Sequence, residues 1–218
     1  MKEKILILSI AGAGKTYLAE HYKNVVDFES LYHLWDYDED IKHLSIDQHK
    51  GNPKRTPNPD YPWNYIEDVK HELEKDRIVV TPGMPNNFYA LCVVGDGKLG
   101  ENVRTILALP HENDFEALAQ RFRNRGNPES FIELVRENFY KAHELYKNYK
   151  NGEYLIIPPG QYLSDALIAH GINLEPGVGI IKENREGGRH LKDKYTTEKA
   201  KKQKYLIDVP SSTITEVQ

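Results

Sequence analysis

A short apolar run that ends in a glycine-rich turn constrains this chain more than any other feature. Lys4–Leu8 leads directly into the segment Ser9-Ile10-Ala11-Gly12-Ala13-Gly14-Lys15-Thr16. A strand, a glycine-rich turn and a helix in this order make an anion nest. The backbone N–H groups of the turn converge on one point, and the helix N-terminus adds its positive end. The pattern therefore predicts a phosphate-binding loop.

The side chains of this loop indicate which phosphates it binds. Lys15 would reach the β- and γ-phosphates of a nucleotide, and Thr16 would hold Mg²⁺ through its hydroxyl. Ser9 stands where the G-x-x-x-x-G-K-[ST] pattern has its first glycine, but the later glycines make the closest backbone approach. The predicted nucleotide-binding residues are Ala11, Gly12, Ala13, Gly14, Lys15, Thr16 and Tyr17.

Length and composition limit the class of protein. The chain has 218 residues and a net charge of −4, which suits one α/β domain and does not favour general binding to nucleic acid or membranes. The single cysteine, Cys92, excludes an internal disulfide and fits a reducing compartment. No secretory signal is visible, and no stretch approaches the ~18 apolar residues that span a bilayer. We expect a soluble cytoplasmic protein with no membrane partner.

Apolar runs alternate with amphipathic segments along the chain. We expect strands at 5–8, 25–27, 78–81, 103–109 and 154–157, and helices at 15–22, 63–73, 84–94, 112–125, 128–149 and 163–169. Such alternation predicts a parallel sheet with right-handed crossovers. Residues 49–62 contain four prolines and are expected to form a loop.

The composition changes after Pro176. Residues 182–204 contain nine Lys or Arg and four Asp or Glu, a net charge of +5, so the remainder carries −9. We therefore expect a domain over 1–176 and a basic, partly ordered tail over 177–218. The tail is interpreted as a solvated segment, with nucleic acid as its alternative partner.

Acidic residues follow the second expected strand, in the segment Asp27-Phe28-Glu29-Ser30. Carboxylates at this place can hold Mg²⁺ through water, or bind a hydroxyl or base of a substrate. The alternative is structural, because Asp27 or Ser30 could cap a following helix. Both interpretations remain open from the residues alone.

Three arginines, Arg121, Arg123 and Arg125, precede a Gly126-Asn127-Pro128 break. Clustered guanidinium groups suit phosphoryl transfer, in which negative charge spreads over the transferring oxygens. On a helix Arg121 and Arg125 share a face, whereas Arg123 points elsewhere. The cluster predicts a lid over the phosphates, and the alternative is charge complementation at a helix C-terminus.

Two absences narrow the chemistry. The expected strand 78–81 ends in Thr81-Pro82 and lacks the terminal aspartate that often helps P-loop hydrolases to hold Mg²⁺. The sequence also lacks the guanine-reading pattern N/T-K-x-D. Both observations argue against a GTPase and against a motor-type ATPase.

Together, Ala11–Thr16, the segment Asp27-x-Glu29-Ser30 and Arg121–Gly126 resemble the P-loop nucleoside and nucleotide kinases, near adenylate kinase and the small bacteriophage kinases. The resemblance implies the P-loop NTPase fold, a three-layer α/β sandwich with a small arginine lid. It also implies a parallel sheet of five strands in the order 2-3-1-4-5.

The same resemblance implies a reaction, in which the γ-phosphoryl group of ATP moves to a nucleoside monophosphate-like acceptor with Mg²⁺ present. The alternatives are a polynucleotide 5′-kinase and a non-catalytic nucleotide-binding module that regulates a partner. The implied catalytic residues are Lys15, Arg121, Arg123 and Arg125; the acceptor-binding residues are Asp27, Glu29 and Ser30; the metal-binding residues are Thr16 and Asp27.

Overall fold

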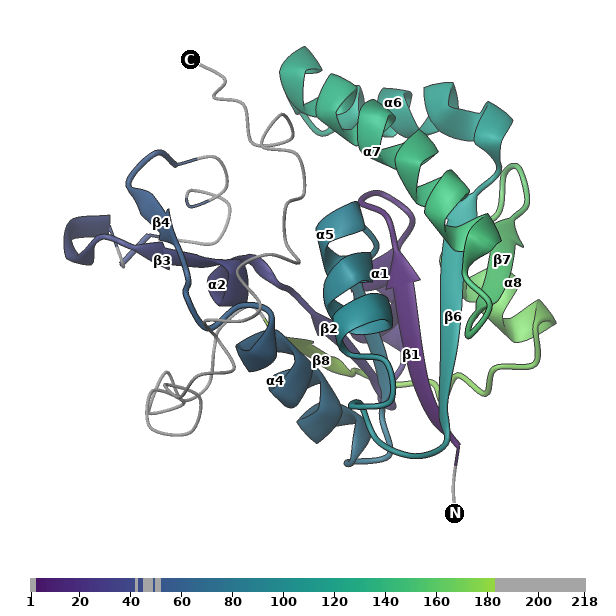
Figure 1. Ribbon diagram of the computed structural model, residues 1–218. Helices are drawn as coiled ribbons and strands as arrows, with labels where there is room; N and C mark the ends of the chain where they lie inside the picture. Colours follow the sequence, from purple (N-terminus) through teal and green to yellow (C-terminus); the bar gives the residue numbers. More distant parts are fainter. Residues whose placement is uncertain (1–2, 42, 45–48, 50–51, 183–218) are drawn as a thin grey trace. The chain divides into compact units, whose positions relative to one another are not determined.

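The computed structural model describes residues 3–41, 43–44, 49 and 52–182 (Figure 1). The chain divides into two units, and the first, Met1–Arg185, contains all of these residues. The boundary expected at residue 176 stays a prediction. Most of the expected basic tail lies outside the described residues, so its proposed partner stays a prediction.

The first unit is built on a parallel sheet of six strands: β1 (Lys4–Ser9), β2 (Val25–Phe28), β5 (Ile78–Pro82), β6 (Val103–Pro110), β7 (Glu153–Ile157) and β8 (Ile180–Lys182). Their order is β7-β6-β1-β5-β2-β8. The prediction of five strands is therefore wrong, because β8 adds a strand beside β2. β1 is central and apolar on both faces, as buried parallel strands are.

The additional strand lies where the sequence predicted a tail. β8 pairs with β2, with Val26 opposite Ile180. The chain approaches this edge closely, because the N–H of Gly179 donates to Ala19 O at 2.7 Å. A Cβ on Gly179 would lie 2.3 Å from Val25 O, so only glycine fits here. Two apolar residues in a basic run are too weak a pattern to predict this strand.

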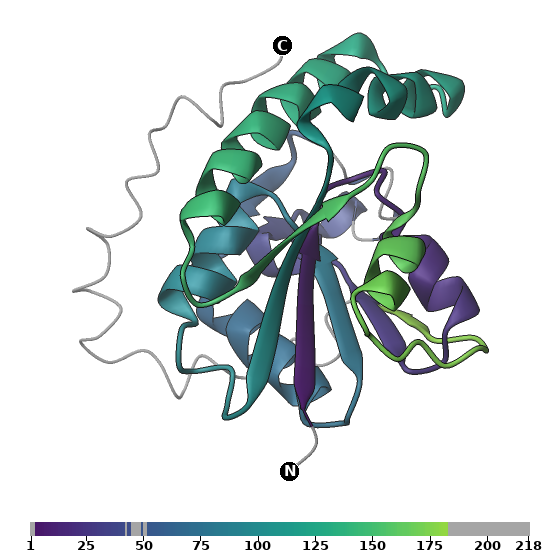
Figure 2. The same cartoon turned by 90° about the vertical axis from the view of Figure 1, so that its right-hand side faces the viewer.

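Helices cover both faces of the sheet (Figures 1 and 2). One face is covered by α1 (Lys15–His21) and α8 (Leu163–Ala169). The other is covered by α4 (Trp63–Leu73), α5 (Pro85–Phe88) and α7 (Glu129–Asn148). α7 buries the apolar stripe that the sequence indicates, including Ile132, Val135, Phe139 and Tyr146. Within the described residues, no helix is long and apolar enough to cross a bilayer.

Two short helical elements adjoin the α-helices. α5 continues directly into a π-helix, η2 (Tyr89–Val94), and the 3₁₀ turn η3 (Glu112–Asp114) precedes α6 (Phe115–Asn124). Phe115, Leu118 and Phe122 of α6 are buried. Because its apolar face joins the core, α6 has a defined position beside the loop that follows β1.

A small antiparallel ribbon stands apart from the main sheet. After β2 come α2 (Leu31–Leu34), β3 (Trp35–Tyr37) and the 3₁₀ turn η1 (Glu39–Ile41), and β3 pairs with β4 (Arg55–Pro57). The prediction of an uninterrupted loop over 49–62 is therefore wrong at β4. A strand of three residues that ends in proline carries no sequence pattern of its own, and its pairing with β3 creates it.

Candidate functional site

The turn after β1 has the backbone shape that a phosphate-binding loop needs. Gly12 and Gly14 have φ values of 78° and 110°, in the left-handed region that favours glycine. The N–H of Ala13 donates to Ile10 O at 3.4 Å and closes the turn. Gly14 is the N-cap of α1, so the N–H groups of the first helical turn, which have no partner within the helix, point out beside the loop.

The two glycines have different surroundings. A Cβ on Gly12 would lie 2.6 Å from Leu118 Cδ1 and 3.0 Å from Phe122 Cζ, whereas a Cβ on Gly14 would meet no atom within 4 Å. One side of the loop is therefore packed against α6. The other side is open where an anion would approach the N-terminus of α1, so the cradle fits a phosphate group.

Ser9, at the position of the missing first glycine, is fully buried at the end of β1. The close backbone approach occurs just after the neighbouring strand, β5, instead. The N–H of Gly83 donates to Ser9 O at 2.7 Å, and a Cβ on Gly83 would lie 2.9 Å from Ser9 N. Gly83 thus allows the two strand ends to meet, and Ser9 leaves the geometry of the turn intact.

Lys15, Thr16 and Asp27 form the polar centre of the site. Lys15 Nζ donates to Ile10 O at 3.1 Å, so its ammonium group lies over the loop. The hydroxyl of Thr16 donates to Asp27 Oδ2 at 2.9 Å. Asp27 belongs to β2 and is only 9% exposed. A hydroxyl and a carboxylate from two distant segments thus meet beside the N-terminus of α1.

The side chains of the acidic segment do not cap the helix that follows it, α2. Ser30 is the N-cap of α2, but no side-chain capping hydrogen bond is present. Asp27 binds Thr16 instead, and Glu29 Oε1 accepts a hydrogen bond from Ser30 N at 2.9 Å. Asp27 and Glu29 both lie at the carboxyl end of β2, the end of the strands at which parallel sheets bind ligands.

The oxygen atoms of Thr16 and Asp27 suit Mg²⁺, which is commonly held by one or two carboxylates together with substrate phosphates and water. Among the described residues, no group of three or more His, Cys, Asp or Glu side chains could hold a metal alone. This arrangement fits a magnesium ion that arrives with a nucleotide.

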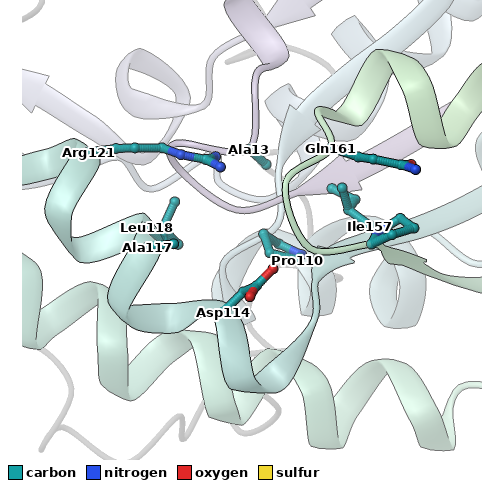
Figure 3. A pocket seen from close by; sticks show the side chains of 9 residues that line it. Ala13, Pro110, Asp114, Ala117, Leu118, Arg121, Ile157 and Gln161 are labelled. Atoms are coloured by element: carbon teal, nitrogen blue, oxygen red, sulfur yellow. The ribbon is translucent and has the colours of Figure 1, made fainter.

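A small pocket opens beside the loop, on the side of α6 (Figure 3). Its enclosed space is about 10 Å³, room for a single water molecule. In Figure 3 the guanidinium of Arg121 reaches from α6 toward Ala13, and Gln161 lies on the opposite wall. The lining residues are Ala13, Pro110, Asp114, Ala117, Leu118, Arg121, Ile157, Pro158 and Gln161.

Sequence reasoning identified Ala13 and Arg121 but missed the other walls of this pocket. Pro110 and Ile157 are the last residues of β6 and β7. Pro110 at the end of β6 and Pro158 directly after β7 were visible signals, because ligands of α/β sheets lie at the carboxyl ends of strands. Tyr17 lies further out. It is 46% exposed and stacks on His21 with ring centroids 3.9 Å apart.

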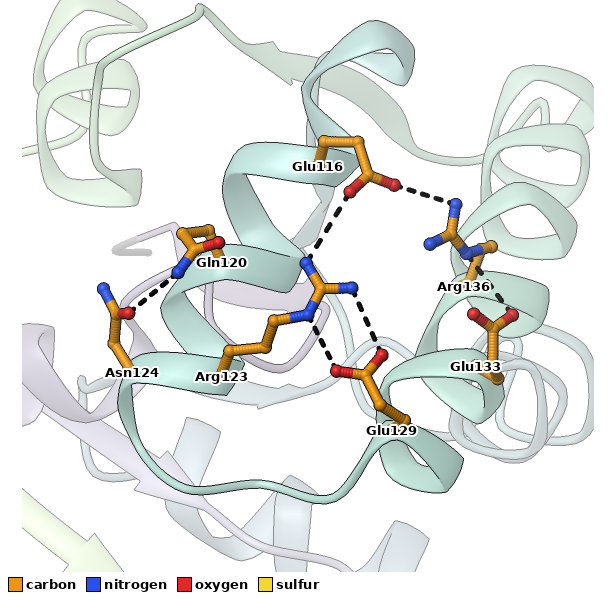
Figure 4. Close-up of polar contacts among 7 residues, drawn as sticks. All are labelled: Glu116, Gln120, Arg123, Asn124, Glu129, Glu133 and Arg136. Carbon is orange, nitrogen blue, oxygen red and sulfur yellow. Dashed lines mark hydrogen bonds and ion pairs between the residues drawn. The ribbon is translucent and has the colours of Figure 1, made fainter.

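The three clustered arginines have different surroundings. The guanidinium carbon of Arg121 lies 5.5 Å from the centroid of the Tyr162 ring. Arg123 forms two hydrogen bonds with Glu129, at 2.7 and 3.2 Å, and lies 3.8 Å from Glu116 (Figure 4). Arg125 is the exposed C-cap of α6. Only Arg121 lines the pocket.

No protein-family model and no curated protein matches the sequence. Solved structures of similar arrangement include a gluconokinase from Sinorhizobium meliloti, with 17% identity over 76% of this chain and 87% of that chain and a TM-score of 0.42. The tunicamycin resistance protein of Deinococcus radiodurans has 16% identity over 81% and 100%, with a TM-score of 0.46.

An uncharacterized protein from Eubacterium ventriosum has 15% identity over 78% of this chain and 97% of that chain, with a TM-score of 0.40. These identities and scores are low, so the likenesses identify neither a reaction nor a substrate.

Proposed function

We propose that this chain is a Mg²⁺-dependent phosphotransferase that moves the γ-phosphoryl group of ATP to a nucleoside monophosphate-like acceptor. The observation that carries the proposal is the 2.9 Å contact of Thr16 with Asp27, beside a glycine turn and a lysine at a helix N-terminus. These are the parts that phosphoryl transfer needs, because that reaction depends on positioning and on charge stabilisation.

Each part has a distinct role in the proposal. The loop amides and Lys15 hold the β- and γ-phosphates, and Thr16 and Asp27 hold Mg²⁺, which would neutralise charge on the phosphates. An acceptor oxygen forms a bond to the γ-phosphorus as the bond to the ADP oxygen breaks. Arg121 faces the loop from α6 and stabilises the charge that develops.

The two sides of the loop then take different substrates. The pocket of Ala13, Arg121 and Gln161 takes the donor's base after its walls separate, since the enclosed space is smaller than a base. The acceptor lies at the carboxyl ends of β2 and β5, near Glu29 and Ser30. Arg123 and Arg125 remain candidates for the lid, although Arg123 is held by Glu129.

The test is calorimetry of Mg²⁺–ATP binding to the wild-type chain and to Lys15→Ala. We expect the substitution to weaken binding at least tenfold, about 1.4 kcal/mol, because a charge between the terminal phosphates is lost. Lys23→Ala is the matched control, since Lys23 follows α1 and pairs with Glu175 at 3.3 Å on the surface. Equal affinities for wild type and Lys15→Ala would refute the phosphate-binding assignment.

A transfer assay with γ-labelled ATP then distinguishes the reactions. Label on a nucleoside monophosphate supports the proposal. Label on the 5′ end of an oligonucleotide would indicate a polynucleotide kinase instead. ATP binding without transfer to any acceptor would favour a regulatory nucleotide-binding module.

A further inference from the structure

The ribbon of β3 and β4 has no role in the reaction described so far, yet one of its faces is chemically unusual. Trp35 and Tyr37 are two residues apart on β3 and therefore point to the same face. Tyr37 lies opposite Arg55 in the register, and Trp35 lies opposite Pro57. Arg55 is thus the diagonal neighbour of Trp35. We call Trp35, Tyr37 and Arg55 the ribbon face.

Arg55 is stacked rather than ion-paired. Its guanidinium carbon lies 4.2 Å from the centroid of the Trp35 ring. Over the described part of the chain, no carboxylate pairs with Arg55, whereas salt bridges hold Arg77, Arg104, Arg123 and Arg136. An aromatic ring orients a guanidinium but leaves the N–H groups at its edge able to bind an anion in two-pronged geometry.

The hydroxyl of Tyr37 supplies an independent observation. Tyr37 is only 8% exposed, and its hydroxyl has no hydrogen-bond partner among the described residues. A buried hydroxyl without a partner is costly and calls for an explanation. Burial raises the pKa of Tyr37, and Arg55 lowers it in part, first by pointing a guanidinium N–H toward the hydroxyl oxygen and then by its charge, so what the hydroxyl lacks is an acceptor for its own proton. The hydroxyl is therefore protonated at neutral pH and can donate a hydrogen bond.

The ribbon face is also electrostatically linked to the candidate site. The carboxylate of Glu29, just after β2, contributes to the raised pKa of Tyr37 and to that of Tyr65 on α4. Glu29 and Asp27 give the acceptor side a negative charge that would repel an anionic substrate. A cation held in a fixed orientation nearby would offset that repulsion and select for such a substrate.

We propose that the ribbon face binds an anionic group, a phosphate or a carboxylate, of the phosphoryl acceptor. Arg55 binds two oxygens of the anion, and the hydroxyl of Tyr37 donates to it, which supplies the partner that this hydroxyl lacks. The inference rests on the proposed function for the identity of this substrate as acceptor. The binding chemistry itself rests on the ribbon face alone.

The test compares matched probes that differ in one anionic group. Calorimetry of the full chain would use the four ribonucleoside 5′-monophosphates against their nucleosides, and glycerate against glycerol, with and without Mg²⁺–ATP. We expect at least one anionic probe to bind tenfold or more tightly than its neutral partner. Preference for a monophosphate would identify a phosphate site, and preference for glycerate a carboxylate site.

Variants assign this preference to residues. Arg55→Gln should abolish it, and Arg55→Lys should restore only part of it, because the planar fork is lost. Tyr37→Phe should weaken the preference severalfold with little change in thermal stability, since the hydroxyl donates no hydrogen bond that the substitution would remove. Lys54→Gln is the matched control, because Lys54 is a neighbouring exposed cation paired with Asp40, and should leave the preference unchanged.

Two results would overturn the inference. One is the absence of any anionic preference in the wild-type chain, including the case in which no probe binds. The other is a preference that survives Arg55→Gln. Failure of the proposed function gives a different signature, the absence of ATP binding in the wild type. The probes measured without ATP on Lys15→Ala, in which the loop has lost its ammonium group, still report on the ribbon face.

Discussion

The proposed donor side of the candidate site, made of the loop and α6, differs in construction from the proposed acceptor side, made of the end of β2 and the β3–β4 ribbon. On the donor side the anion cradle is backbone from one short segment, Ser9–Thr16, whose glycines have positive φ. On the acceptor side the chemistry comes from side chains that distant pairing brings together, such as Tyr37 opposite Arg55. A motif therefore encodes the first region, whereas tertiary contacts encode the second.

The two sides have one structural feature in common, an arginine stacked on an aromatic ring. Arg121 lies over Tyr162 and Arg55 over Trp35, each stacked on an aromatic ring. By contrast, Arg104 and Arg123 form two-pronged salt bridges with glutamates. Stacking alone does not separate the two groups, because Arg136 stacks on Phe115 and is also paired with Glu116 and Glu133. Arg121 and Arg55 differ in that, among the described residues, they stack without a carboxylate partner, which is why we propose that their donors serve ligands.

The largest effect is expected at Asp27, where the two sides meet. Asp27→Asn should lower turnover tenfold or more, which is about 1.4 kcal/mol of barrier or more, because the carboxylate charge beside the phosphates is lost. Thermal stability should change little, since the amide oxygen can still accept the hydrogen bond from Thr16. Steady-state kinetics and thermal melting measure both quantities. Full activity in Asp27→Asn would show that Asp27 serves the fold alone.

A smaller effect should separate the clustered arginines. Arg121→Ala should lower kcat up to about tenfold, more than it weakens ATP binding, if the guanidinium acts mainly on the transition state. Arg123→Ala is the matched substitution two residues away, and it should leave kcat near the wild-type value because its partners are Glu129 and Glu116. The measurement is kcat and ATP affinity for each single variant with a known acceptor. Equal losses in both variants would show that Arg123 acts in the reaction together with Arg121.

The sequence predicted the elements whose pattern is local. β1, the turn and α1 follow from apolar alternation, glycines and Gly-Lys-Thr within a short segment. The long stripe of α7 repeats often enough to be recognised. Asp27 was also placed at the second strand and paired with Thr16 as a metal ligand, but the direct hydrogen bond between the two was not predicted, because that contact depends on how β2 packs beside α1.

The sequence could not predict features that pairing alone creates. β4 contains three residues and a proline, and it exists because β3 lies beside it. β8 depends on the close approach of Gly179 to α1 and β2. The pocket walls at Pro110 and Gln161 come from segments far apart in the chain. The ribbon face was hidden for the same reason.

The smallest effect is expected away from both sides, at the salt bridge that joins β6 to β7. Arg104 donates to both carboxylate oxygens of Glu153, at 2.6 and 2.8 Å, and His170 lies 2.6 Å from the same group. The Arg104 hydrogen bonds, with help from His170, lower the pKa of Glu153 to about 2 from an ordinary value of 4.5. The side chain is 41% exposed, so solvent screening keeps its contribution small.

This shift predicts an acid dependence of stability with a definite sign. Because the folded-state pKa lies below the unfolded value, the ionised carboxylate stabilises the fold above about pH 4.5, and this contribution is lost as the pH falls toward 2. Urea unfolding of Glu153→Gln should therefore show a shallower loss of stability over that range than the wild type.

β6 and β7 end in the pocket walls Pro110 and Ile157, so ATP affinity at neutral pH is the accompanying measurement. We expect the ATP affinity to be unchanged. Glu153 begins β7, at the opposite end of this strand from the pocket, and the backbone of the loop forms the phosphate cradle. A loss of ATP affinity in Glu153→Gln would show that the donor side also depends on distant side chains, and the contrast between the two sides would then fail.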